Sequence, residues 1–194
     1  MNNIKYFTLL SRDYPNVQRA ASEIISLEAR LKLPKSTEMY MSDIHGEHEA
    51  FSHILNNASG VIREKIDVAL EGQTTPEENA ILATLIYYPV QKLEEIKQTQ
   101  EDMSSWYKTA LHRLIDVCRH VASKNTRQWV RQAIPEEYAF IIDELLHAHF
   151  EDHNKEFYYN QFVTAIIENK TADDFIVAIS TVIKRLAVHR LHIV

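Results

Sequence analysis

Two short apolar runs with the pattern of β-strands, at residues 37–42 and 190–194, enclose a long series of helical patterns. Two strands separated by helices favour a parallel pair, because parallel neighbours need a long crossover connection. The chain has only three glycines and five prolines in 194 residues, which argues against a β-protein with many tight turns. The sequence therefore predicts a mainly α chain with a small parallel β element.

The helical patterns are delimited by ordinary start and stop signals. Asp13 is expected to cap a first helix that has Pro15 in its first turn and an apolar face from Val17 to Leu31. The strongest start is Thr75-Pro76-Glu77-Glu78, where a capping hydroxyl precedes proline and two carboxylates at the positive end of the helix dipole. Further helices are expected at 47–57, 61–70, 89–100, 103–123, 135–146, 156–169 and 171–186, with a basic connector at 124–131.

Composition excludes several classes of function. The net charge is −6 and there is no basic run, so nucleic acid is not an expected partner. No apolar stretch approaches the ~18 residues of a membrane span, and no signal peptide is recognisable. The single Cys118 excludes an internal disulfide and fits a reducing cytoplasm; it falls on an apolar helix face and is expected to be buried and inert.

The clearest candidate for chemistry is Ser42-Asp43-Ile44-His45-Gly46, at the end of the first strand. Alternate strand residues point to the same side, so Asp43 and His45 can reach one ion. A carboxylate with an imidazole suits Mn²⁺, Fe or Zn²⁺, and Gly46 allows a sharp turn. The residues alone leave open an ordinary turn with a surface histidine.

Residues 42–47 resemble the first motif of the calcineurin-like metallophosphoesterase superfamily, with Ser42 where glycine is typical. Longer segments resemble one branch, the class III fructose-1,6-bisphosphatases of Firmicutes. These segments are 9–11, 14–15, 51–62, 87–89, 134–135, 141–147 and 183–188.

The resemblance implies a hydrolase that converts fructose 1,6-bisphosphate to fructose 6-phosphate in gluconeogenesis, with a dinuclear Mn²⁺ centre. Asp43 and His45 would be metal ligands. Residues 1–59 and 187–194 would be part of a metallophosphoesterase sandwich, and 60–186 a helical insertion that shapes the substrate side or a homo-oligomer interface. In the family, the strand matching 191–194 continues into a Gly-Asp-x-x-Asp-Arg-Gly motif that bridges the metals. The chain is therefore expected to be an N-terminal fragment with no complete catalytic set, inactive alone.

A second hypothesis is a non-catalytic helical interaction or regulatory module that retains the Asp-x-His turn as a relic. Other polar residues keep two interpretations each. His147, His149 and His153 could bind a second metal, although a helix end followed by a polar connector explains them better. Lys124, Arg127 and Arg131 could hold a phosphate, and His48 could approach one, although solvated surface positions are the simpler explanation.

Overall fold

The computed structural model describes residues 2–34, 37–42, 45–57, 60–147 and 155–194. The chain divides into two compact units, Met1–Lys35 and Ser36–Val194. The sequence instead predicts a core of residues 1–59 and 187–194 that is interrupted by a helical insertion at 60–186. The division into two units does not test that arrangement, which stays a prediction.

The first unit contains two helices, α1 (Asn2–Asp13) and α2 (Val17–Arg30). The expected cap at Asp13 is wrong, because Asp13 ends a helix that the sequence patterns did not reveal. Asn16 caps α2 instead, and its side chain accepts a hydrogen bond from the Arg19 amide at 2.8 Å. Pro15 explains the break, since proline cannot donate to the preceding turn and disfavours helical geometry in the residue before it.

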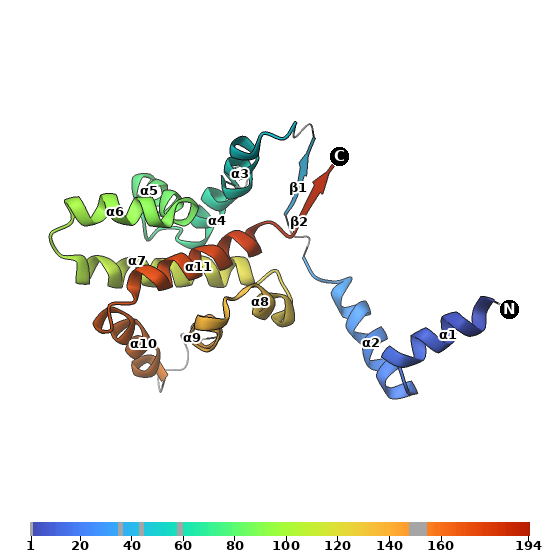
Figure 1. Ribbon diagram of the computed structural model, residues 1–194. Coiled ribbons are helices and arrows are strands. Elements are labelled where there is room, and N and C mark those ends of the chain that lie inside the picture. The colour runs from blue at the N-terminus through green and yellow to red at the C-terminus, as the bar shows by residue number, and fades with distance from the viewer. Residues whose placement is uncertain (1, 35–36, 43–44, 58–59, 148–154) are drawn as a thin grey trace. The chain divides into compact units, whose positions relative to one another are not determined.

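The second unit is a helical bundle joined to a two-stranded sheet (Figure 1). Its helices, which match most of the expected ranges within a few residues, are α3 (His48–Asn57), α4 (Val61–Ala69), α5 (Pro76–Tyr87), α6 (Pro89–Thr99), α7 (Met103–Ala122), α8 (Arg127–Ala133), α9 (Ala139–Leu146), α10 (Glu156–Glu168) and α11 (Ala172–Ala187). A 3₁₀ turn, Glu136–Tyr138, precedes α9.

The basic stretch 124–131 is not the connector that we expected. Thr126 caps a helix there, and its hydroxyl accepts a hydrogen bond from the Trp129 amide at 3.2 Å. Arg127 to Arg131 thus lie on the seven-residue helix α8, which ends before Pro135. A threonine at this position is a local signal for the start of a helix, but the basic residues around it favoured the interpretation as a connector.

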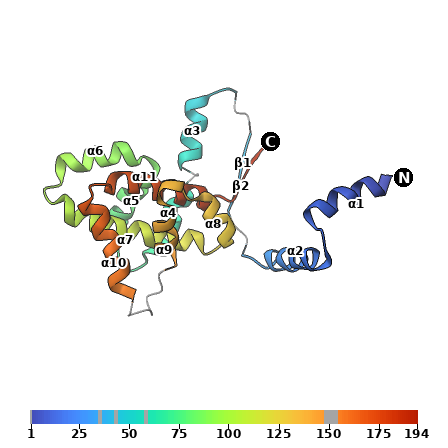
Figure 2. The same ribbon diagram turned by 60° about the horizontal axis from the view of Figure 1, so that its bottom comes forward.

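The two strands pair as the sequence predicts. β1 (Glu38–Met41) and β2 (Arg190–Ile193) are parallel and adjacent, with Met39 opposite Leu191. Figures 1 and 2 show them side by side at one end of the helical bundle. Neither strand is buried in this chain, because Tyr40 of β1 is 67% exposed and Ile193 of β2 is 62% exposed. Both strands belong to a sheet of only two strands within the described residues.

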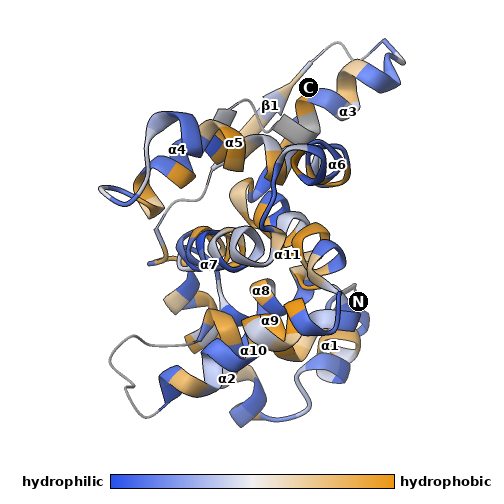
Figure 3. Cartoon of the chain, turned by 90° about the vertical axis from the view of Figure 1, so that its left-hand side faces the viewer, coloured by the Kyte–Doolittle hydropathy of each residue, from blue (hydrophilic) through white to orange (hydrophobic). Residues whose placement is uncertain are grey.

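Helix α11 is the centre of the core. Ten of its 16 residues are buried, among them Phe175, Ile176, Val182 and Ile183 at 0% exposure. It contacts α4, α5, α6, α7, α8 and α10, and it lies beside α7 in Figures 1 and 2. Figure 3 shows that the surrounding helices carry both hydrophobic and hydrophilic residues, as expected for helices with one side against a core.

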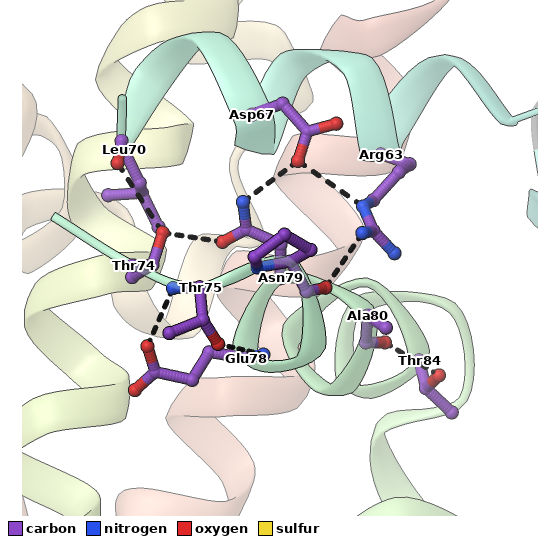
Figure 4. Close-up of polar contacts among 10 residues, drawn as sticks. Arg63, Asp67, Leu70, Thr74, Thr75, Glu78, Asn79, Ala80 and Thr84 are labelled. Carbon is purple, nitrogen blue, oxygen red and sulfur yellow. Dashed lines mark hydrogen bonds and ion pairs between the residues drawn. The ribbon is translucent and has the colours of Figure 1, made fainter. Parts of the chain in front are cut away.

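The start of α5 has the geometry that its sequence predicts (Figure 4). The Thr75 hydroxyl accepts from the Glu78 amide at 3.2 Å, and the Glu78 carboxylate accepts from the Thr75 amide at 2.8 Å. Next to this capping box, the buried Asn79 accepts from Thr74 and donates to Asp67 on α4. Local capping and a buried polar bridge therefore fix α5 against α4.

We expect Thr75→Ala to lower the free energy of unfolding by about 1 kcal/mol, because the Glu78 amide loses its acceptor. The measurement is chemical denaturation followed by circular dichroism. Thr84→Ala is the matched control, since the Thr84 hydroxyl donates only to the Ala80 carbonyl within the same helix. Equal destabilisation by the two variants would contradict a capping role.

Cys118 is fully buried on α7, as predicted, and burial raises the pKa of its thiol to about 12. Because the thiolate is the reactive form, we expect no reaction with a disulfide reagent at pH 8 in the folded chain. Reaction should become fast once a denaturant unfolds the protein. The absorbance of the released thiol measures both rates, and rapid labelling without denaturant would show that α7 opens readily.

Candidate metal centre

The carboxyl ends of β1 and β2 meet at one edge of the sheet, because the strands are parallel. The Val194 amide donates to the Met41 carbonyl at 2.8 Å, one step beyond the last strand pair, Met41 and Ile193. At the opposite end, the His189 amide donates to the Thr37 carbonyl, also at 2.8 Å. The backbone that follows β1 therefore leaves the sheet beside the end of β2.

The segment after β1 turns sharply before α3. His45 has φ 47° and Gly46 has φ 73°, so two successive residues adopt the left-handed conformation. This geometry costs roughly 1–2 kcal/mol at a residue other than glycine, and strained backbone of this kind is concentrated at functional sites. The Glu47 carbonyl then accepts from the Phe51 amide at 2.9 Å, within the first turn of α3.

One described residue of this turn has a side chain that can bind a divalent metal ion. His45 supplies an imidazole, and a Cβ placed on Gly46 would meet nothing within 4 Å, so the turn is open to an approaching group. Asp43 lies outside the described residues, and its convergence with His45 stays a prediction. Among the residues that the structure describes, no group of three or more His, Cys, Asp or Glu is arranged to hold a metal.

The other histidines near the motif have protein partners. His48 Nε2 lies 3.4 Å from the Ser52 hydroxyl, one helical turn along α3. His53 Nδ1 lies 2.6 Å from the Tyr88 hydroxyl, at the junction of α5 and α6. Both contacts support a structural role.

The second metal hypothesis concerned His147, His149 and His153. His147 ends α9, and its Nδ1 lies 2.6 Å from the Asp143 backbone carbonyl, as expected for an imidazole at a helix end. His149 and His153 lie outside the described residues. A metal at this cluster therefore stays a hypothesis.

One polar cluster on the sheet was missed by the sequence analysis. Tyr40 and His192 occupy paired positions and stack with ring centroids 4.5 Å apart. Glu38 accepts from the Tyr40 hydroxyl at 3.2 Å and lies 3.1 Å from His192 Nε2. The hydrogen bond with His192 lowers the pKa of Glu38. The strand period places residues 38 and 40 on one face, but only the register identifies His192 as their neighbour.

No helix in the described part of the chain is both long enough and apolar enough to cross a membrane.

Comparison with known proteins supports the resemblance seen in the motifs. Fructose-1,6-bisphosphatase class 3 of Clostridium novyi is 54% identical over 192 residues, which is 99% of this chain and 29% of the relative. The class 3 enzyme of Clostridium acetobutylicum is 50% identical over 193 residues, which is 100% of the chain and 29% of the relative. One from Clostridium beijerinckii is 47% identical over 193 residues, or 30% of its length. The chain thus spans less than a third of these relatives.

No solved structure matches this chain significantly. The sequence model of the Firmicute fructose-1,6-bisphosphatase family matches residues 5–194. That match includes both strands, the turn at His45 and the whole helical bundle, so the chain belongs to the Firmicute fructose-1,6-bisphosphatase family.

Proposed function

We propose that this chain supplies the first metal ligands of a metal-dependent fructose-1,6-bisphosphatase. The whole enzyme would hydrolyse fructose 1,6-bisphosphate to fructose 6-phosphate and phosphate, a step of gluconeogenesis. The observation that carries the proposal is the strained turn at His45, which lies where β1 leaves the parallel pair, in a chain of this family. A sugar bisphosphate is the substrate implied by the names of the relatives.

Asp43 and His45 are the residues that would hold the ion. The carboxylate of Asp43 provides a hard, anionic oxygen, and neutral His45 provides a ring nitrogen, a set that suits Mn²⁺. Gly46 lets the chain reverse without a side chain beside the ion. Metal ions in a dinuclear phosphatase centre lower the pKa of a bound water and neutralise charge on the phosphoryl oxygens.

The proposed site needs ligands beyond these two residues. The chain spans 29% of the length of its C. novyi relative, and within the described ranges no third ligand joins His45 in a metal-binding group. Two ligands hold a dinuclear centre poorly, because each ion needs several donors and a shared carboxylate. We therefore propose that the isolated chain retains metal weakly and lacks phosphatase activity.

The wider architecture follows from the same proposal. β1 and β2 would be strands of a metallophosphoesterase sandwich, in which further strands cover the exposed Tyr40 and Ile193. The helical bundle would be an insertion between them, available for subunit contacts. A cytoplasmic location is proposed on the basis of metabolic relatives and of a buried, reduced Cys118.

We expect Mn²⁺ to bind the 194-residue chain weakly and to be lost on dialysis, as judged by the electron paramagnetic resonance signal of free Mn²⁺. Asp43→Asn should abolish the residual binding, because an amide is a much weaker ligand than a carboxylate. Asp13→Asn, at an exposed acid of α1, is the control and should bind like the unmodified chain. Identical titrations for the chain and its Asp43→Asn variant would remove Asp43 from the site.

Phosphate release should be undetectable when the isolated chain is mixed with fructose 1,6-bisphosphate and Mn²⁺. In a full-length relative, substitution of the aspartate that matches Asp43 by asparagine should reduce turnover by at least about 100-fold, since even changes to groups behind a metal ligand cost about 10–100-fold. Circular dichroism verifies that each protein is folded. Robust turnover by the isolated chain would overturn the need for further ligands, and full activity of the full-length variant would favour the relic interpretation of the turn.

A further inference from the structure

A cavity of about 270 Å³ with a mixed polar and apolar lining lies where α7, α8 and α9 meet, away from the turn at His45. It is bordered by the last turn of α7, the loop that follows it, the first turn of α8 and the end of α9. Its lining residues are Arg119, Ala122, Ser123, Asn125, Arg127, Val130, Leu146 and His147. Among the described residues, the lining contains two arginines and a histidine but no carboxylate, in a chain whose net charge is −6.

Arg119 is held in place on one wall of this cavity. Its Nε donates to the Leu145 carbonyl at 2.9 Å, and its Nη1 donates to Asp116 Oδ1, also at 2.9 Å. These bonds fix the plane of the guanidinium group and neutralise Asp116, the nearest carboxylate on α7. A guanidinium that is already ordered loses little entropy when a ligand binds.

The carboxylate of Asp143 on α9 is neutralised as well. Arg131 Nη2 donates to Asp143 Oδ2 at 3.1 Å, and His147 Nδ1 lies 3.5 Å from Asp143 Oδ1. Arg131 is therefore unavailable for the phosphate role that the sequence analysis considered for it. Its ion pair cancels the negative charge that would otherwise oppose an anion at the cavity.

The remaining positive charge is not balanced in the same way. Arg127 is exposed and makes no ion pair with any residue that the structure describes. Lys124 and Lys65 border an adjoining hollow that shares Asn125 with the cavity. Burial lowers the pKa of the neighbouring His120, and the charges of Lys124 and Lys65 lower it further. The end of α7 is thus a region of positive potential.

We propose that this cavity binds the phosphate group of a small phosphorylated compound. Arginine forks match the oxygens of a phosphate group, and here one fork is preordered on α7 while a second, Arg127, lacks an ionic partner within the described chain. The volume exceeds what a bare phosphate needs but lies below the ~300–1,000 Å³ of a site for a drug-sized ligand. The apolar side of the lining, formed by Ala122, Val130 and Leu146, suits a short carbon skeleton.

The site is separate from the proposed metal centre and does not depend on it. The cavity is lined by α7, α8, α9 and the loop after α7, whereas His45 follows β1. Binding to the isolated chain in the presence of a chelator therefore tests the cavity alone, and loss of the phosphatase proposal would leave this result unchanged.

Isothermal titration calorimetry of the 194-residue chain, with EDTA and with ionic strength held constant by NaCl, provides the test. The probes are inorganic phosphate and glycerol 3-phosphate. We expect saturable binding, weakened about 10-fold or more in Arg127→Ala and in Arg127→Gln, since a hydrogen bond to a charged group contributes about 1.5–3 kcal/mol. Tighter binding of glycerol 3-phosphate would identify a phosphorylated compound, and equal binding would identify free phosphate; both support a phosphate site.

Arg12→Ala is the matched control, because it removes the same charge from an exposed position of α1 and should leave binding unchanged. Circular dichroism of each variant verifies folding. The proposal is overturned if neither probe binds saturably up to roughly 10 mM, or if the folded Arg127 variants bind both probes like the unmodified chain. Equal weakening by Arg12→Ala would also overturn it, since that result would indicate a general charge effect.

Discussion

The burial of α11 is the interaction on which the second unit depends. This helix contacts most of the helices around it, and burying each large aliphatic or aromatic side chain contributes about 1.5–3 kcal/mol. Its ends add polar ties: Asp173 accepts from the Tyr107 hydroxyl at 2.6 Å and pairs with Lys97, while Arg185 donates to the Ala133 carbonyl at 2.9 Å. These contacts tie α6, α7 and α8 to α11.

The position of α11 also decides where the sheet forms. The helix ends at Ala187, and only Val188 and His189 separate it from β2. Because α11 is fixed by the core, β2 emerges in a set direction, and β1 pairs with it over the full length of both strands. Closing a disordered connection of nearly 150 residues would cost conformational entropy. The folded helical bundle avoids this cost, because it already holds the two strands near each other. The turn that carries His45 is in this way supported by helices far from it in the sequence.

Charge is distributed unevenly in this acidic chain. Carboxylates on α7 and α9 are bound by arginines. Arg127, Lys124 and Lys65 form no ion pair with the described residues and gather near the end of α7. On the sheet, Glu38 is shared by Tyr40 and His192. Both arrangements join residues from separate elements, so each depends on the bundle and the strand pairing already being formed.

Much of the local structure was determined by the sequence itself. The Thr75 cap, most of the helices that follow it, the burial of Cys118 and the parallel pairing of the two strands were all predicted, whereas the return bond from Glu78 was not. Short-range sterics, capping hydrogen bonds and hydrophobic periodicity are encoded within a few residues, and a long helical stretch between two strands leaves little choice of pairing. The family resemblance was likewise readable from segments distributed along the chain.

Tertiary structure alone decided which polar groups meet. The sequence left Arg131 as a candidate for binding phosphate, but the fold pairs it with Asp143. The fold also places Arg127 at a cavity between α7, α8 and α9. The sequence also gave no sign that Tyr40 would stack on His192, more than 150 residues away. Charged and aromatic residues on separate elements follow no short-range rule about their partners, because their interaction energies depend on distances that only the packed helices and paired strands establish.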